Sequence, residues 1–249
     1  MKKIPVIAVV GPTASGKTAL SINIAKRFSG QVVSADSMQI YEKMNIATAK
    51  PTEEEMQGIP HHLIGFQPID KKFSVAEYVQ LANECIHKIH NAGDLPVETT
   101  EDKRNYRKFR NITCALIVGI SGAGSTNIVY ADMRPGSCDD AIDVLRENGL
   151  LEEAEEFYNI SADKTACQAI GYKELAPYFR GDATLEDCVE KLKLETRHYA
   201  KRQLTWFRKN ENVNWVYPDD YENTQEMYIQ VFSMINDFLR RYKNEDENQ

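Results

Sequence analysis

One pattern near the N-terminus limits the folds open to this chain more than any other feature. Residues 11–18 read Gly-Pro-Thr-Ala-Ser-Gly-Lys-Thr and match the phosphate-binding pattern G-x-x-x-x-G-K-S/T in full. The glycines let backbone N–H groups turn inward to phosphate oxygens, the lysine adds a positive charge, and the final hydroxyl can hold Mg²⁺. Such a loop works between a buried strand and a helix N-terminus, whose dipole also favours anions.

The residues on either side of this loop have the patterns that it needs. Residues 4–10 form a continuous apolar run typical of a parallel strand buried on both faces. Residues 17–28 repeat apolar side chains at helical spacing, and residues 31–35 indicate a second short strand. Strand, loop, helix and strand make the βαβ unit of an α/β fold. We therefore expect a parallel sheet core of the P-loop NTPase-like type.

The remainder of the chain favours helices. We expect two parts, a P-loop α/β core at residues 1–125 and a mainly helical part at residues 126–249 that packs on the core. A third strand is predicted at residues 112–120, and the charged stretch at 97–110 is expected to be exposed. The amphipathic patterns predict helices at about residues 74–91, 137–149, 150–159, 165–179, 185–208 and 225–242.

Composition and charge exclude several classes of protein. The longest apolar runs are too short to cross a membrane. The five cysteines are odd in number and never spaced as C-x-x-C, which favours neither a disulfide framework nor a zinc site. We therefore expect a cytoplasmic protein with no membrane association. The net charge is −7, so nucleic-acid binding requires a local basic surface.

One segment provides such a surface. Residues 197–209 contain five basic residues and no acidic residue, with Arg197, Lys201 and Arg208 on one helix face. Aromatic residues are interleaved with them, which suits a surface that meets RNA phosphates and stacks on unpaired bases. The alternative is a solvated charged face whose aromatics belong to the core. Trp206 and Phe207 are adjacent and point apart, so at least one should be buried.

A carboxylate follows the second predicted strand. Asp36 lies at the carboxyl end of residues 31–35, where α/β folds place their chemistry, and so should lie near the bound phosphates. Its local pattern leaves two other roles open. Asp36 could cap a helix N-terminus or contact Mg²⁺ through water.

Several segments occur in an order typical of bacterial tRNA dimethylallyltransferases, the IPP transferase family, which the chain resembles. The resemblance covers about residues 4–96 and 137–215. The segments are GPTASGKT at 11–18, SADSMQIY at 34–41, ATAKPT at 47–52, GIPHHLI at 58–64, FSVA at 73–76, QAIGYKEL at 168–175 and TRHYAKRQLTWFR at 196–208.

The resemblance implies an activity and its participants. The loop would hold the diphosphate of dimethylallyl diphosphate, and the dimethylallyl group would pass to N6 of the adenine next to the tRNA anticodon (position 37), with release of diphosphate. Asp36 would be the general base, and Lys17 with Mg²⁺ would stabilise the departing diphosphate. The target base must be unstacked to be reached. We expect the protein to act as a monomer.

The implied site residues form three groups. The catalytic residues are Asp36 and Lys17. The diphosphate ligands are Gly11, Pro12, Thr13, Ala14, Ser15, Gly16, Lys17 and Thr18, with the Thr18 hydroxyl as the metal ligand. The tRNA-binding residues are Asp36, Ser37, Met38, Gln39, Arg197, Lys201, Arg202 and Arg208.

The chain departs from the family in its middle. The family follows an L-P dipeptide with a buried strand, a G-G-T-G-L-Y motif and a helical insertion, whereas Leu95-Pro96 is followed here by a charged stretch. Residues 117–122 could replace the motif, or residues 110–118 could match a later family segment with everything between removed. We expect the insertion to be largely missing. The alternatives are therefore an impaired tRNA or phosphate binder, an adenine-nucleotide prenyltransferase, or a small-molecule P-loop kinase.

Overall fold

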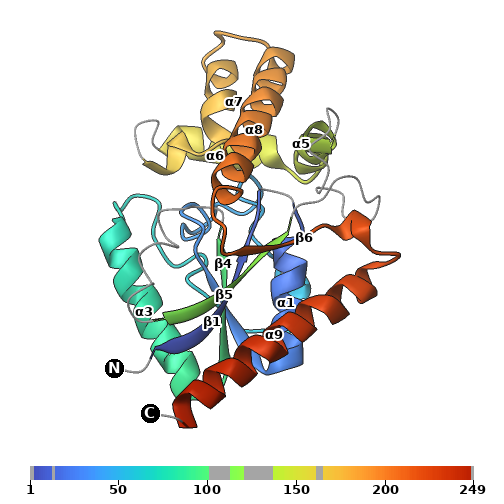
Figure 1. Ribbon diagram of the computed structural model, residues 1–249. Helices are drawn as coiled ribbons and strands as arrows, with labels where there is room; N and C mark the ends of the chain where they lie inside the picture. The colour runs from blue at the N-terminus through green and yellow to red at the C-terminus, as the bar shows by residue number, and fades with distance from the viewer. Residues whose placement is uncertain (1–2, 13–14, 101–112, 121–136, 161–164, 248–249) are drawn as a thin grey trace.

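A parallel sheet lies at the centre of the molecule (Figure 1). The computed structural model describes residues 3–12, 15–100, 113–120, 137–160 and 165–247. The strands in these ranges are β1 (Ile4–Val10), β2 (Gly30–Ser34), β3 (His61–His62), β4 (Leu95–Thr100), β5 (Thr113–Ile120) and β6 (Val213–Val216). They pair in the order β3-β2-β4-β1-β5-β6, and every pairing is parallel.

The register places β4 between the first two strands of the chain. Val97 of β4 lies opposite Ile7 of β1 on one side and opposite Val32 of β2 on the other. β1 also pairs with β5, so the strand that leads into the phosphate loop is central and covered by neighbours on both edges. This is the parallel α/β core predicted from the βαβ pattern, and the prediction is confirmed.

Helices cover both faces of the sheet. Figure 1 shows α3 on one face and α1 with α9 on the other. A parallel sheet needs such cover because both of its faces are apolar. The helices are α1 (Lys17–Phe28), α2 (Glu53–Met56), α3 (Val75–Asn91), α5 (Ser137–Glu147), α6 (Leu150–Ile160), α7 (Tyr172–Phe179), α8 (Leu185–Phe207) and α9 (Thr224–Glu247).

Side chains alternate along β1 between two apolar clusters. Ile7 and Val9 pack with Leu20 of α1 and Val231 of α9. Val6 points to the opposite face and packs with residues of α3. The continuous apolar run at residues 4–10 is thus explained by burial on both sides.

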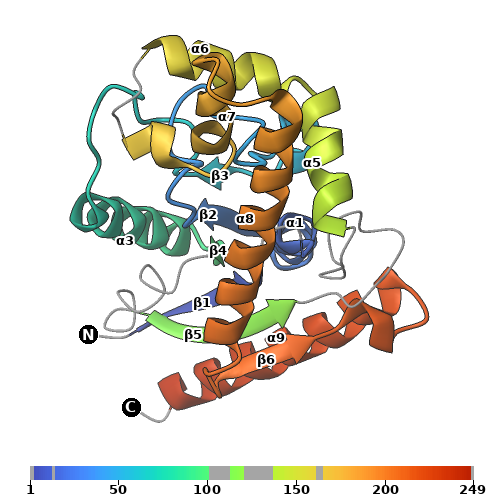
Figure 2. The same cartoon turned by 90° about the horizontal axis from the view of Figure 1, so that it is seen from above.

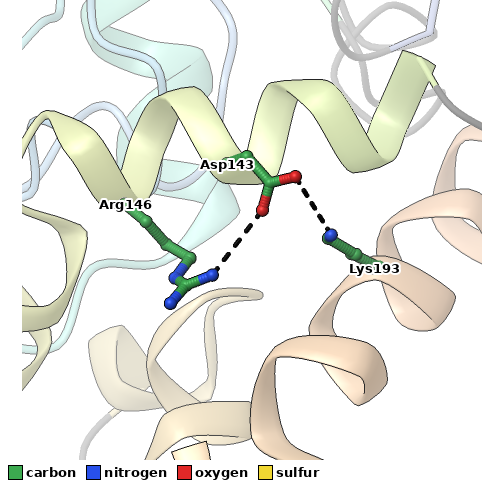
Figure 3. A network of polar contacts seen from close by, with 3 residues as sticks. All are labelled: Asp143, Arg146 and Lys193. Atoms are coloured by element: carbon green, nitrogen blue, oxygen red, sulfur yellow. Dashed lines mark hydrogen bonds and ion pairs between the residues drawn. The ribbon is translucent and has the colours of Figure 1, made fainter. Parts of the chain in front are cut away.

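The helices α5 to α8 form a separate layer beside the sheet, which we call the helical lobe (residues 137–160 and 165–207; Figures 1 and 2). Its apolar core includes Leu150, Phe157 and Leu192, and it also takes in Tyr41 and Met44 from the loop that follows β2. Between α5 and α8, the Asp143 carboxylate lies 3.1 Å from the Lys193 ammonium and 3.7 Å from Arg146 (Figure 3). Within the described residues, no helix combines the length and apolar character that a membrane span requires.

Most of the predicted elements are confirmed. The strands at residues 31–35 and 112–120 correspond to β2 and β5, and the helix at 17–28 is α1. The helix predicted from Ser74 is α3, with Ser74 as its N-cap: the Ser74 hydroxyl accepts from the Glu77 N–H at 3.2 Å. The division into a core at 1–125 and a helical part at 126–249 stays a prediction, and β6 and α9 add a strand and a helix to the sheet layer from beyond residue 126.

Two expectations differ from the structure. Residues 97–100, expected to be exposed, belong to β4, because this strand is covered by β1 and β2 at its edges and by helices on its faces. The helix expected at 165–179 is a 3-10 turn at Thr165–Gln168 followed by α7, because Gly171 between them has a φ of 109°. The short elements α2, β3 and β6 were not predicted.

The packing of α9 gives a direct test of the fold. Ile235 is fully buried against the sheet, so Ile235→Ala should lower the free energy of unfolding by about 2–4 kcal/mol through lost burial and a cavity. Ile229 on the same helix is 62% exposed, and Ile229→Ala should change it by less than about 0.5 kcal/mol. Urea unfolding of both variants measures the difference. Equal effects would contradict the placement of α9.

Candidate active site

The phosphate loop lies where β1 ends and α1 begins. Gly11 and Pro12 are buried directly after β1, and Gly16 adopts a left-handed conformation with a φ of 86° and a ψ of 13°. Glycine takes this conformation without strain, which explains its place before the helix. Thr13 and Ala14, also predicted as diphosphate ligands, lie outside the described residues.

Two polar groups of the loop are buried. The Lys17 side chain is 8% exposed, and its ammonium donates to the Pro12 carbonyl at 2.6 Å, so it folds back over the loop. The Ser15 hydroxyl is buried without a hydrogen-bond partner within the described residues. Buried polar groups nearly always have partners. A phosphate oxygen in the loop would satisfy this hydroxyl and meet the Lys17 charge, so the residues present fit an anion.

Thr18 is the candidate ligand for Mg²⁺. Its side chain is exposed in the first turn of α1. No group of three or more His, Cys, Asp or Glu side chains able to hold a metal ion occurs among the described residues. Mg²⁺ commonly binds one or two protein oxygens together with substrate phosphates, and the Thr18 hydroxyl beside an anion loop fits that arrangement.

Asp36 caps the turn that follows β2. Its Oδ1 accepts from the backbone N–H of Met38 at 2.7 Å and from that of Gln39 at 3.2 Å. The sequence left a helix N-cap open as a role for Asp36; the structure has a turn at residues 37–40 instead of a helix, and Asp36 caps that turn. These two bonds also fix the orientation of the carboxylate. The general-base role of Asp36 stays a prediction.

The Gln39 side chain braces the same turn. Its Oε1 accepts from the Ser34 hydroxyl at 3.1 Å, and its Nε2 donates to the Thr48 carbonyl at 3.1 Å. The Tyr78 hydroxyl of α3 donates to the Ser34 carbonyl at 2.9 Å. Ser37 is exposed and Met38 half-buried. Both polar atoms of the Gln39 side-chain amide are therefore hydrogen-bonded. The role of residues 37–39 in cradling the target base stays a prediction.

The sheet brings the loop and Asp36 to one edge. Val10 lies opposite Thr100, and Ser34 lies opposite Thr99, so β1, β4 and β2 end at the same level. Adjacent strands are about 4.8 Å apart, which puts the ends of β1 and β2 about 10 Å apart across β4. A diphosphate and an attached five-carbon group can span this separation.

The basic segment lies on the last turns of α8. Lys201, Arg202 and Arg208 are exposed and Arg197 is half-buried, while Phe207 is buried in one apolar cluster with Val10, the last residue of β1. The prediction that at least one of the adjacent aromatics is buried is confirmed by Phe207, whereas Trp206 is half-buried. The basic segment therefore approaches the same edge as the phosphate loop. Its role in tRNA binding stays a prediction.

Glu98, which no sequence pattern singled out, lies inside the sheet beneath this edge. The side chain is 3% exposed, its Oε1 has no partner within the described residues, and burial raises its pKa to about 8. Burial, with the nearby Glu98 and Asp36 carboxylates, also raises the pKa of Tyr78. Glu98 is therefore a neutral acid at pH 7, in a stretch that its charge had marked as exposed.

The fold and the loop define a P-loop α/β protein, and comparison with known proteins gives its family. The IPP transferase family model matches residues 39–99 and 135–210. A tRNA dimethylallyltransferase of Thermoanaerobacter sp. (strain X514) is 33% identical over 308 residues, covering 93% of this chain and 98% of the relative. A tRNA dimethylallyltransferase of Limosilactobacillus reuteri (strain DSM 20016) is 34% identical over 311 residues, covering 95% of this chain and 99% of the relative. The chain belongs to the IPP transferase family.

A solved structure agrees with this membership. The tRNA isopentenylpyrophosphate transferase of Bacillus halodurans superposes with a TM-score of 0.85 and 30% identity, covering 98% of this chain and all of the other. The alignments with the two curated relatives are longer than the 249 residues of this chain. The relatives therefore contain residues with no counterpart here, and the break in the family match falls at residues 100–134.

The raised pKa of Glu98 predicts how stability depends on pH. Above its ordinary pKa of 4.5 Glu98 is ionised in the unfolded chain, but in the fold it stays protonated up to about pH 8. Because the folded state then binds the extra proton, stability should fall by about 1.4 kcal/mol per pH unit across this window. Glu98→Gln should remove this pH dependence, and the variant should be more stable than the wild type at pH 8.

Urea unfolding at several pH values measures this effect. The exposed Glu84 on α3 offers a matched control, and Glu84→Gln should keep the pH dependence of the wild type. The same pH dependence in Glu98→Gln and wild type would contradict a buried, protonated Glu98.

Proposed function

We propose that this protein transfers a dimethylallyl group from dimethylallyl diphosphate to N6 of the adenine next to the tRNA anticodon. The observation that carries the proposal is the meeting of the phosphate loop and Asp36 at one edge of the sheet. The names of the relatives, tRNA dimethylallyltransferase, support the substrate and the reaction.

The phosphate loop binds the donor. Its backbone N–H groups and the Lys17 ammonium contact the diphosphate oxygens, with the buried Ser15 hydroxyl beside them. As the bond between the allylic carbon and oxygen breaks, negative charge builds on the diphosphate, and Lys17 stabilises it in place. Mg²⁺, held by the Thr18 hydroxyl and the diphosphate, would supply further positive charge to the same oxygens.

Asp36 acts on the acceptor. The N6 nitrogen attacks the allylic carbon and forms the new C–N bond, diphosphate leaves, and the Asp36 carboxylate accepts the N6 proton. The N–H groups of Met38 and Gln39 hold this carboxylate in one orientation. The adenine must leave its stack to reach the site, and residues 37–39 lie beside the place it would occupy.

The exposed basic residues of α8 bind the tRNA backbone. Three cations, Lys201, Arg202 and Arg208, are exposed on a chain whose net charge is −7, so they form a local positive surface. Phe207 shares an apolar cluster with Val10, the last residue of β1, and this supports a position of the basic segment near the loop. A small acceptor such as AMP has no need of an extended cationic face.

A competition assay tests the function. Dimethylallyl diphosphate carrying a radiolabel in its five-carbon group is offered with tRNA, AMP and ATP in parallel reactions containing Mg²⁺. We expect label in tRNA alone. Label in a free nucleotide alone would overturn the proposal in favour of an adenine-nucleotide prenyltransferase.

Replacement of the proposed base separates binding from chemistry. Asp36→Asn keeps the Oδ1 that accepts from Met38 and Gln39 but cannot take the proton. We expect turnover to fall by about 10²-fold or more with unchanged affinity for dimethylallyl diphosphate. Asp70→Asn, at an exposed loop position, is the control. Turnover of Asp36→Asn equal to that of the control would leave Asp36 with a capping role alone.

Neutralisation of α8 tests the tRNA surface. Changing Arg197, Lys201 and Arg208 to glutamine should weaken tRNA binding and lower the slope of log K against log salt by about one unit per lost phosphate contact. Affinity for dimethylallyl diphosphate should not change. The same changes at the exposed Arg240, Arg241 and Lys243 of α9 give a matched control. Equal loss of tRNA binding in both triple variants would place the RNA elsewhere.

A further inference from the structure

Glu153 of α6 joins the helical lobe to the loop that carries Asp36. We call residues 36–50 the Asp36 loop. The Glu153 Oε2 accepts from the Asn45 N–H at 2.9 Å, and its Oε1 accepts from the N–H groups of Ile46 at 3.0 Å and Ala47 at 3.1 Å. Three successive backbone donors therefore converge on one carboxylate from more than 100 residues away in the chain.

A fourth donor reaches the same carboxylate from α7. The Tyr172 hydroxyl donates to the Glu153 Oε1 at 2.6 Å, and its ring packs on Phe157 in the core of the lobe. Burial and the bond to Glu153 raise the pKa of Tyr172, so the hydroxyl keeps its proton and remains a donor. Hydrogen bonds to a carboxylate are about twice as strong as those between neutral groups. The carboxylate is thus fixed on both the loop side and the lobe side.

Close backbone packing reinforces this contact. Gly171, just before α7, has a φ of 109°, and a Cβ added there would lie 2.8 Å from the Cβ of Ala47. Glycine is needed at this position for both reasons. The Asp36 loop therefore lies against the lobe at two adjacent points, a carboxylate and a glycine.

Hydrogen bonds lead from this contact to Asp36. Directly after the residues held by Glu153, the Thr48 carbonyl accepts from the Gln39 Nε2 at 3.1 Å. The Gln39 backbone N–H in turn donates to the Asp36 Oδ1 at 3.2 Å. Loss of the hydrogen bonds between Glu153 and residues 45–47 would therefore weaken the Gln39 hydrogen bonds that orient the Asp36 carboxylate.

We propose that Glu153 is a positioning residue for the transfer reaction, an inference that rests on the proposed function. It fixes the Asp36 loop to the same lobe whose α8 carries the basic segment. The helical lobe then holds both the Asp36 loop and the bound tRNA. As a result, the Asp36 carboxylate lies within reach of N6 in a geometry that allows proton transfer. Glu153 touches neither donor nor acceptor.

Two glutamates on α6, Glu153 and Glu156, provide the test variant and its matched control. Glu153→Gln keeps the size of the side chain but turns an NH₂ group towards N–H donors. At saturating tRNA and dimethylallyl diphosphate, we expect turnover to fall about tenfold or more, since small losses of position are costly, while the KM for dimethylallyl diphosphate stays within about twofold. Glu156, one turn further on, pairs with the exposed Lys43 of the same loop at 3.0 Å. Glu156→Gln should keep the turnover of the wild type.

Hydrogen exchange gives a second readout that needs no substrate. The amides of residues 45–47 should exchange faster in Glu153→Gln than in the wild type or Glu156→Gln. Faster exchange with wild-type turnover would overturn the positioning role. If Glu153→Gln does not fold, Tyr172→Phe decides: reduced turnover at unchanged KM supports the role, and wild-type turnover contradicts it. An inactive wild type would instead refute the proposed function, and the role of Glu153 with it.

Discussion

The position of β4 between β1 and β2 is the constraint on which the rest of the site depends. β1 leads into the phosphate loop and β2 leads into Asp36, and both strands are aligned by the same third strand. Because the carboxyl ends of parallel strands meet at one edge of the sheet, the phosphate loop and Asp36 both lie at that edge. They are separated there by the width of β4. Neither segment alone contains this arrangement; the sheet order creates it.

Loops above this edge then decide how the site meets its substrates. In the described part of the phosphate loop, the Lys17 ammonium donates to the Pro12 carbonyl. The Asp36 loop is instead anchored from outside, by Glu153 and by close packing at Gly171. Since α8 of the same lobe carries the basic segment, the lobe links the proposed tRNA surface to Asp36, the proposed general base. This contact of Lys17 is thus local in the chain, whereas the contacts that anchor the Asp36 loop are tertiary.

This difference explains what the sequence could predict. The phosphate loop, α1 and the amphipathic helices are encoded by neighbouring residues, so local patterns sufficed for them. Residues 97–100 were expected to be exposed because the stretch at 97–110 is charged, whereas Glu98 and Thr100 are buried in a strand that lies between β1 and β2. Glu153 had no local signal, because its backbone partners lie more than 100 residues earlier in the chain. Thr13 and Ala14 remain known from the sequence pattern alone.

Mass spectrometry of tRNA nucleosides is the most direct test of this account. Unmodified tRNA is incubated with the protein, dimethylallyl diphosphate and Mg²⁺, digested to nucleosides and compared with a reaction lacking the donor. The meeting of a phosphate loop and a fixed carboxylate at one sheet edge predicts adenosine that carries a dimethylallyl group at N6, from the position next to the anticodon. Recovery of unmodified adenosine alone, from protein that binds both tRNA and dimethylallyl diphosphate, would contradict it.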